Sequence, residues 1–171
     1  MKNISSITAA ALLIPAMFIT SAIAADTTVI NIKANIVATS CLVTTTVLNI
    51  DLGNIQGGTI QNAGSSTPWS GENVIDLTGC PLGTTSVDAK FTGTTAPNDT
   101  NGYKNTGGDD AVSVQLGDGA STPKYFSNNT IINQPIANNG AQIKLHARLY
   151  TSGVAKPGAV NSTVNVEFSY K

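Results

Sequence analysis

The sequence predicts an all-β protein, and three of its features lead to that prediction. Only 11% of the 171 residues are charged, whereas Thr, Asn, Ser and Gly are abundant, a composition that favours extended chain and polar turns over helices. Beyond the N-terminal segment, no window repeats apolar residues with the 3.6-residue period of a helix. Short stretches instead alternate apolar and polar residues with the period of two that is typical of half-buried strands.

The first 24 residues are predicted to be a signal peptide and do not enter the fold prediction. Lys2 gives a positive start, residues 9–19 are apolar, and Ala22-Ile23-Ala24 has the small-x-small pattern that signal peptidase recognises. The apolar stretch is too short for a comfortable membrane span. We therefore expect an exported protein that does not insert into a membrane. Its mature chain would begin at Ala25, leaving 171 − 24 = 147 residues for a single domain.

Six alternating stretches of the mature chain are predicted to be strands, in addition to a first strand within 35–43. Turn-rich runs such as 93–110 and 117–129 separate them, and regularly spaced short strands with such breaks indicate a β-sandwich. The residues expected to point inward are Leu48, Ile50 and Leu52; Ile75 and Leu77; Val87, Ala89 and Phe91; Val112, Val114 and Leu116; Ile143, Leu145, Ala147 and Leu149; and Val164, Val166, Phe168 and Tyr170.

The two cysteines, Cys41 and Cys80, both lie in strand-like segments. In an exported protein they are expected to form one disulfide, because two thiols and a single histidine cannot supply the four ligands of a structural zinc site. Closing a loop of roughly 40 residues would stabilise the fold by about 4 kcal/mol in the chain-entropy model. No metal site and no cofactor are predicted.

Charge and histidine content argue against nucleic-acid binding and against catalysis. Removal of Lys2 leaves eight basic and ten acidic residues, a net charge of −2, without a basic cluster for nucleic acid. His146 shares the outward face of its strand with Lys144 and Arg148 and is expected to be solvated. No serine or cysteine nucleophile stands in a recognisable pattern with it. We therefore predict no catalytic residues and no enzymatic activity.

The start of the mature chain contains more strand-like sequence than the local hairpin pattern can use. Thr28, Ile30, Ile32 and Ala34 would lie on one face of an extended segment, and no turn residue separates this segment from 35–43. One interpretation is a single long first strand over 27–43. The other is a separate segment that pairs elsewhere. The sequence also ends while still strand-like, and so apolar an edge strand is expected to need a covering partner.

Several motifs together resemble one known family. They are Ile36 to Cys41, Asp51-Leu52-Gly53, Leu77-Thr78-Gly79-Cys80-Pro81-Leu82-Gly83-Thr84, Phe91-Thr92-Gly93, Val164 to Phe168, and the penultimate Tyr170. In this order they resemble the subunits of type 1-like fimbriae that the chaperone–usher pathway assembles, and they are most similar to the minor or adaptor pilins. The cysteine spacing, the Leu-Thr-x-Cys-Pro-x-Gly-Thr run and the penultimate tyrosine are the most specific parts of the match.

The resemblance implies an incomplete immunoglobulin-like β-sandwich, the pilin fold, which lacks its seventh strand and carries one disulfide. Residues 25–34 would be an N-terminal donor strand, and 35–171 the pilin domain. The implied partners are a periplasmic chaperone, an outer-membrane usher and neighbouring pilin subunits, in a hetero- or homopolymer. The implied destination is the fimbria at the cell surface, where the subunit would support cell adhesion.

The resemblance also assigns roles to individual residues. Thr28, Ile30, Ile32 and Ala34 would enter the open groove of the next subunit, although the family usually has glycine where Ala34 stands. The other role belongs to the last strand, which would form the groove edge that pairs with the chaperone, and the terminal carboxylate would lie near basic residues of that chaperone. The residues concerned are Val164, Val166, Phe168, Tyr170 and Lys171.

A second function class remains open from the sequence: a self-contained secreted or periplasmic β-sandwich that binds carbohydrate. In such a module residues 25–34 would belong to the domain's own sandwich. Trp69, which follows Pro68 in a polar turn, is then a candidate platform for stacking a sugar ring. We expect instead that Trp69 covers one end of the core.

Overall fold

The computed structural model describes residues 30–35 and 40–171, and these two parts are treated separately. Residues 30–35 contain neither helix nor strand, and Ile30 and Ile32 are 79% and 88% exposed. The predicted signal peptide, Thr28 and residues 36–39 lie outside the described residues. Within the described part of the chain, no helix has the length and apolar character that crossing a membrane requires.

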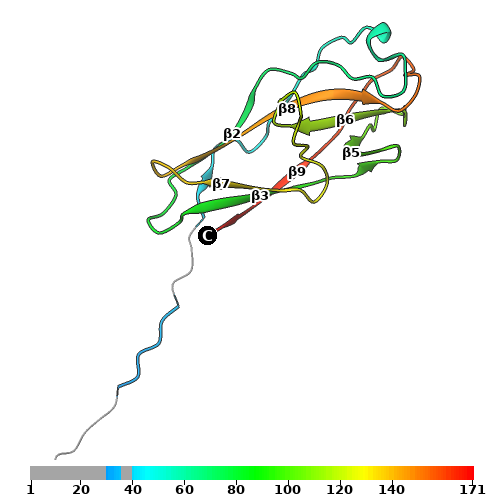
Figure 1. The fold of residues 1–171 in the computed structure, drawn as a ribbon. Coiled ribbons are helices and arrows are strands. Elements are labelled where there is room, and N and C mark those ends of the chain that lie inside the picture. The colour runs from blue at the N-terminus through cyan, green and yellow to red at the C-terminus, as the bar shows by residue number, and fades with distance from the viewer. Residues whose placement is uncertain (1–29, 36–39) are drawn as a thin grey trace, which may run out of the picture. The chain divides into compact units, whose positions relative to one another are not determined.

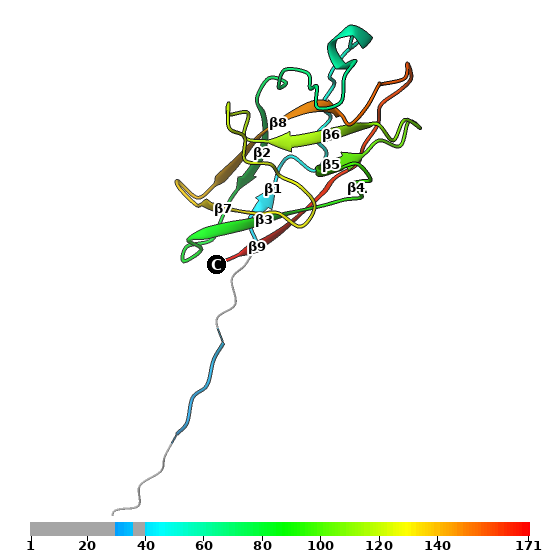
Figure 2. The same cartoon turned by 45° about the vertical axis from the view of Figure 1, so that its right-hand side comes forward.

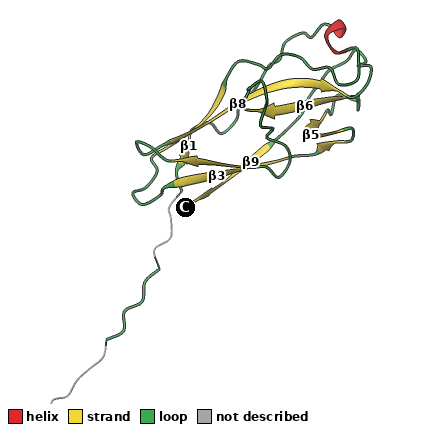
Figure 3. Cartoon of the chain, in the orientation of Figure 1, coloured by secondary structure: helices red, strands yellow, loops and turns green. Residues whose placement is uncertain are grey.

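Residues 40–171 form a β-sandwich of two antiparallel sheets packed face to face (Figures 1 and 3). The larger sheet has the strand order β1-β2-β8-β6-β5-β4, and the smaller has the order β7-β3-β9. One four-residue 3₁₀ helix, Gly57–Ile60, lies between β1 and β2. The strands are β1 (Leu42–Val43), β2 (Asn73–Thr78), β3 (Ser86–Thr92), β4 (Thr95–Ala96), β5 (Asp99–Lys104), β6 (Val112–Gly117), β7 (Ile131–Pro135), β8 (Ala141–Thr151) and β9 (Asn165–Tyr170).

The core lies between the two sheets and is built from side chains at every second position. The predicted inward rows of β2, β3 and β8 are confirmed: Leu77, Val87, Phe91 and Ile143 are each at most 2% exposed. β8 follows the alternation over all its 11 residues because it lies inside the sheet, between β2 and β6.

Three strands were not predicted, and their composition explains why. β4 is a two-residue strand in the polar run 93–110, which was expected to contain only turns, and β5 follows it in the same run. The β5 sequence, Asp-Thr-Asn-Gly-Tyr-Lys, carries a single apolar residue, Tyr103, which is fully buried. The Tyr103 hydroxyl donates to the carbonyl of Phe126 (2.7 Å), and burial raises the pKa of Tyr103 to about 12. The third missed strand is β7, where Asn133, Gln134 and Pro135 conceal the pattern.

β6 is buried on both faces, whereas only one buried face was expected. Ser113 and Gln115, on its outer face, are each 2% exposed. The Asp99 carboxylate of β5 accepts from Ser113 Oγ (2.6 Å) and from Gln115 Nε2 (2.9 Å), so these polar groups are paired. Gly102 makes this approach possible, since a Cβ there would lie only 2.3 Å from Asp99 Oδ2.

The structure corrects two expectations for the outer face of the larger sheet. His146 is half-buried rather than solvated, and its Nδ1 lies 2.8 Å from the Ser70 carbonyl oxygen. Trp69 does not cover an end of the core. Its ring lies instead against the guanidinium of Arg148, 4.3 Å from the ring centroid, on the outer face of β8. The reason is that the segment around Trp69 pairs with β8, through Thr67 N to Leu149 O and Ser70 N to Ala147 O.

Candidate interaction edge

The three-stranded sheet has β9 at one edge, and among the described residues β9 pairs only with β3. The pair Ser86 and Lys171 exchanges two backbone bonds, from Lys171 N to Ser86 O (3.0 Å) and from Ser86 N to Lys171 O (3.3 Å). In an antiparallel ladder such bonded pairs alternate, so Asn165, Glu167 and Ser169 also bond to β3. The N–H and C=O groups of the intervening residues therefore point away from the sheet, at Val166, Phe168 and Tyr170.

A second unpaired segment follows β1. The β1–β2 ladder continues through Thr44 N to Asp76 O and ends where Asp76 N donates to Thr45 Oγ1. Residues 46–52 then make no backbone–backbone hydrogen bond with any described residue. The alternation predicted for 47–52 is nevertheless present, since Leu48, Ile50 and Leu52 are half-buried and their neighbours are exposed. The sequence therefore predicts the extended conformation correctly, but the ladder that defines a strand is missing.

The side chains of both unpaired segments rest on the same core. Seven of them are half-buried and pack against the main core cluster, and we call this set the apolar strip. β1 and β9 lie toward the same side of the sandwich (Figures 1 and 2). Burial also raises the pKa of Tyr170, one member of the strip. The strip consists of Leu48, Ile50, Leu52, Val164, Val166, Phe168 and Tyr170.

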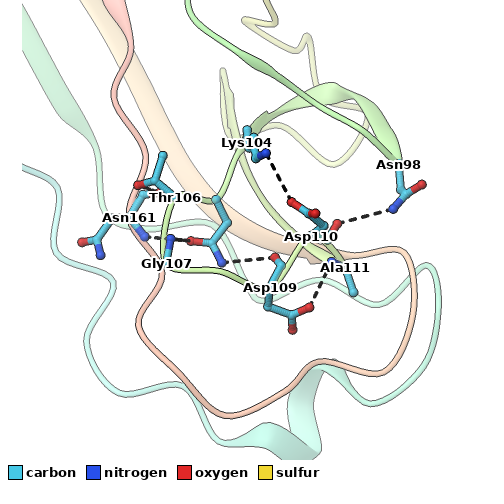
Figure 4. Close-up of polar contacts among 9 residues, drawn as sticks. Asn98, Lys104, Thr106, Gly107, Asp109, Asp110, Ala111 and Asn161 are labelled. Carbon is cyan, nitrogen blue, oxygen red and sulfur yellow. Dashed lines mark hydrogen bonds and ion pairs between the residues drawn. The ribbon is translucent and has the colours of Figure 1, made fainter.

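A network of polar contacts fixes the chain where it enters β9 (Figure 4). Asn105, only 2% exposed, accepts from Gly107 N (2.8 Å) and Asn161 N (3.0 Å) at Oδ1, and Thr106 N donates to Asn161 O. Gly107 is required here, because a Cβ at this position would lie 1.8 Å from the Ala159 carbonyl oxygen. The β5–β6 turn thereby holds the segment that leads to Val164, the first member of the strip on this side.

The other end of β9 is held by a charged contact. Lys171 Nζ lies 2.5 Å from Asp88 Oδ2, and Asn133 Nδ2 donates to Asp88 Oδ1 (2.5 Å). The hydrogen bonds from Asn133 and Lys171 hold the pKa of the Asp88 carboxyl below its usual range. Asp88 lies on β3, Asn133 on β7 and Lys171 directly after β9, so this carboxylate connects all three strands of the smaller sheet.

The predicted disulfide is present, with Cys41 and Cys80 Sγ atoms bonded and their Cα atoms 4.2 Å apart. It joins the residue before β1 to the connection between β2 and β3. Both cysteines are buried in the main core cluster. The bond therefore fixes β1, and with it the start of the unpaired segment 46–52, against the sandwich.

The structure brings together some of the predicted site residues and not others. Val164, Val166, Phe168 and Tyr170 form one row, and Ile30, Ile32 and Ala34 lie in the exposed segment 30–35. Residues 47–52, which carry the other members of the apolar strip, were predicted only as a core strand. Nothing in their local sequence shows that they lack a backbone partner. In the described residues, no three side chains of His, Cys, Asp or Glu gather as metal ligands would.

The fimbrial protein family model matches residues 30–171. FimG of Escherichia coli K12 is 29% identical over 148 residues, covering 86% of each chain. The S-fimbrial adhesin protein SfaS of Escherichia coli O6:K15:H31 is 33% identical over 150 residues, covering 88% of each chain. Among solved structures, the P pilus rod subunit PapA superposes with a TM-score of 0.65 at 14% identity, covering 78% of this chain and 100% of that one.

The comparisons and the structure agree on the fold and the family. The two-sheet arrangement with its disulfide is the immunoglobulin-like pilin fold of PapA. The family match spans nearly all of the described chain, and relatives of similar length align along most of theirs. The chain therefore belongs to the fimbrial protein family and is a subunit of fimbriae, which are exported to the cell surface.

Proposed function

We propose that this subunit polymerises by donor-strand exchange, with residues 25–34 as the donor and the apolar strip as the acceptor. The observation that carries the proposal is a double deficit of backbone partners. Within residues 30–35 and 40–171, the outer edge of β9 and residues 46–52 both lack a backbone partner, and both rest on the same core cluster. One strand inserted between them would pair with both and cover the strip.

The donor and the β9 row have matching lengths. Thr28, Ile30, Ile32 and Ala34 supply four alternate positions, and Val164, Val166, Phe168 and Tyr170 also supply four. Each row spans about 20 Å at the usual rise of a strand. Ile30 and Ile32 are largely exposed, and burying both would contribute roughly 3–6 kcal/mol. Ala34, where relatives are expected to have glycine, would require slightly more room in the acceptor.

Before assembly, the same edge would be occupied by a strand of a periplasmic chaperone, which would deliver the subunit to an outer-membrane usher. Strand addition to a sheet edge is a recognised binding mode, and chaperone–pilin complexes are known instances of it. The role of the subunit in this scheme is structural and adhesive, without catalysis. In support of this, the buried polar side chains of β5 and β6 pair with one another: the Asp99 carboxylate is occupied by Ser113 and Gln115.

The competing function, a self-contained carbohydrate-binding module, finds less support. Its candidate platform, Trp69, is half-buried and has the guanidinium of Arg148 against its ring. Arg148 is itself held by Gln115 Oε1 (2.9 Å) and by the Tyr125 hydroxyl (2.8 Å). A sugar ring stacking on this side of Trp69 would therefore have to displace a fixed cation.

The proposal is tested by comparing the mature chain with a variant lacking residues 25–34, each purified as a complex with its chaperone. Incubation should yield SDS-resistant ladders from the intact chain, because its donor segments replace the chaperone strand. The shortened chain should still bind chaperone and accept a donor, but should not extend a polymer. Ladders of equal length from both proteins would refute the assignment of the donor.

A point variant separates the donor's sequence from its mere presence. Ile32→Asp places a carboxylate where an aliphatic side chain would be buried, and should abolish donation because burying an unpaired charge is costly. Lys33→Asp, on the opposite face of the same segment, is the matched control and should donate normally. Loss of donation in both variants would show that charge, rather than strand insertion, governs the assembly.

A further inference from the structure

Two leucines stand exposed at one end of the sandwich. Leu82 is 95% exposed, in the turn between β2 and β3, and Leu42 of β1 is 65% exposed. Cys41 and Cys80, their near neighbours in sequence, are joined by the disulfide, so the two leucines belong to the same end. Figures 1 and 2 both show β1, the β2–β3 turn and the C-terminal end of β9 here, and we call this the β1 end.

The turn that carries Leu82 has a rigid base. Thr84 N donates to Pro81 O (3.2 Å), and Gly83 has a φ of +95°, which completes the turn. Cys80 N donates to Asn139 O (2.9 Å) in the β7–β8 connection. An apolar side chain held in this way loses little conformational entropy when a partner covers it, a property typical of a contact surface.

Covalent connection determines which partner comes close to this end. Only five peptide units separate Asn35 from Ser40, so the two residues are at most about 18 Å apart. Any subunit that has bound the donor segment is thereby tethered next to the β1 end. A tether this short gives an effective concentration in the millimolar range, at which even a weak apolar contact is occupied.

The strand direction identifies the facing surface of the acceptor. Every ladder in the described domain is antiparallel. A donor that runs antiparallel to β9 leaves the strip where β9 begins, next to the β8–β9 connection. Figures 1 and 2 place that connection at the end opposite the β1 end, and its Val154 is 73% exposed. Consecutive subunits would then meet head to tail, which produces an open fibre.

We propose that Leu42 and Leu82 form a second contact with the acceptor subunit, at the end of that subunit where its β9 begins. This inference rests on the proposed donor-strand exchange and adds to it a surface outside the donor and the strip. Neighbouring subunits are then joined at two points, the covalent tether and the leucine contact at the β1 end. Two points of attachment restrict the angle between the subunits.

The test follows the exposure of individual methyl groups in one sample. The mature chain, labelled at its Ile, Leu and Val methyls and kept in complex with its chaperone, is mixed with an unlabelled second copy, whose chaperone strand the labelled donor segment replaces. That copy carries Ile30→Asp and Ile32→Asp and therefore accepts but does not donate. A soluble gadolinium chelate relaxes exposed methyls, so the relaxation of each methyl reports its exposure. The Ile32 methyl reports donor insertion, Leu42 and Leu82 report the second contact, and Val154 of the labelled copy is the internal control.

On insertion, relaxation of the Leu42 and Leu82 methyls should fall to roughly a third, as expected when an interface excludes water, while Val154 stays unchanged. When the label is moved to the acceptor copy, Val154 should become protected instead. A protected Ile32 with unchanged Leu42 and Leu82 overturns the second contact and leaves donor-strand exchange standing. An Ile32 methyl that remains exposed overturns donor-strand exchange itself, and this inference with it.

Discussion

The two edges of the three-stranded sheet differ in what they offer to another strand. β9 presents the N–H and C=O groups of Val166, Phe168 and Tyr170, and the side chains of these three residues pack against the core. At the β7 edge, Phe91 N bonds to Thr130 O and Ile136 N to Thr85 O, so the outward backbone groups belong to Ile131, Asn133 and Pro135. Pro135 has no N–H, and β7 therefore offers one donor fewer.

The inner sides of the two edges also differ. Behind β7 lies a pocket of about 340 Å³, and charged and amide side chains stand at it beside Ile132. Gln134 of β7 faces inward at this pocket, whereas Asp118, Lys124 and Lys144 are exposed at its rim. The apolar strip behind β9 contains no charged side chain. Proline and inward-facing polar groups are the usual means of preventing edge association, so β7 is protected and β9 is left available. The comparison teaches that one sheet can direct pairing to one of its edges.

The largest effect is expected from placing a charged side chain on the inner side of β9, where every member of the apolar strip is uncharged. Val166→Asp should lower the rate of donor uptake at least ~100-fold, because the new carboxylate would be buried without a partner. Gln134→Asp, the matched change on the inner side of β7, should alter uptake less than about twofold. Chaperone-bound variants mixed with a peptide of residues 25–34 allow both rates to be measured. Equal losses would show that the two edges are equivalent.

The next largest effect is expected from removing the disulfide, which holds β1 to the connection between β2 and β3. In a subunit complemented by donor peptide, the double variant Cys41→Ala, Cys80→Ala should lose about 4 kcal/mol of unfolding free energy, since a loop of 39 residues is no longer closed. Urea denaturation measures this loss. The wild-type protein treated with a reductant is the control, and an unchanged midpoint would contradict the structural role of the bond.

A smaller effect is expected from removing the protection of the β7 edge. Pro135→Val restores a backbone donor there, and should increase aggregation of the complemented subunit several-fold without changing donor uptake. Pro157→Val, in the exposed β8–β9 connection, is the control for loss of a proline. Light scattering at constant protein concentration distinguishes the two. Should both variants aggregate equally, the edge position of Pro135 would not be the reason.

The smallest effect concerns Asp88, which connects both edges through Asn133 and Lys171. Because its pKa is lowered in the folded protein, its stabilising contribution is present above pH 4 and is lost as the pH falls through the folded pKa. Asp88→Asn should therefore flatten the decrease in melting temperature on acidification below about pH 4. Glu167→Gln, an exposed carboxylate on β9, controls for the change of charge. Parallel acid curves for wild type and Asp88→Asn would refute the assignment.

The sequence correctly predicts the strands in which the inward-facing side chains are apolar and the outward-facing side chains are polar. For β2, β3 and β8 it gives both the position and the inward face, and the prediction succeeds because period-two alternation depends only on burial of one face. It fails for the two-residue β4, and for β5 and β7, where Asp99, Gly102 and Asn133 serve contacts with neighbouring strands rather than local propensity. Trp69 and His146 were misplaced for a related reason, since the partner of each lies far away along the chain.

The sequence by itself determined the fold class, the cysteine pair, the inward rows and the motifs of the family, because each of these depends on residue type and spacing. Only the tertiary structure decided which backbone groups remain without partners. Residues 47–52 and 86–92 alternate equally well, yet one segment is unpaired and the other is central in its sheet. A hydrogen bond between strands joins residues distant along the chain, and its absence therefore leaves no local trace in the sequence.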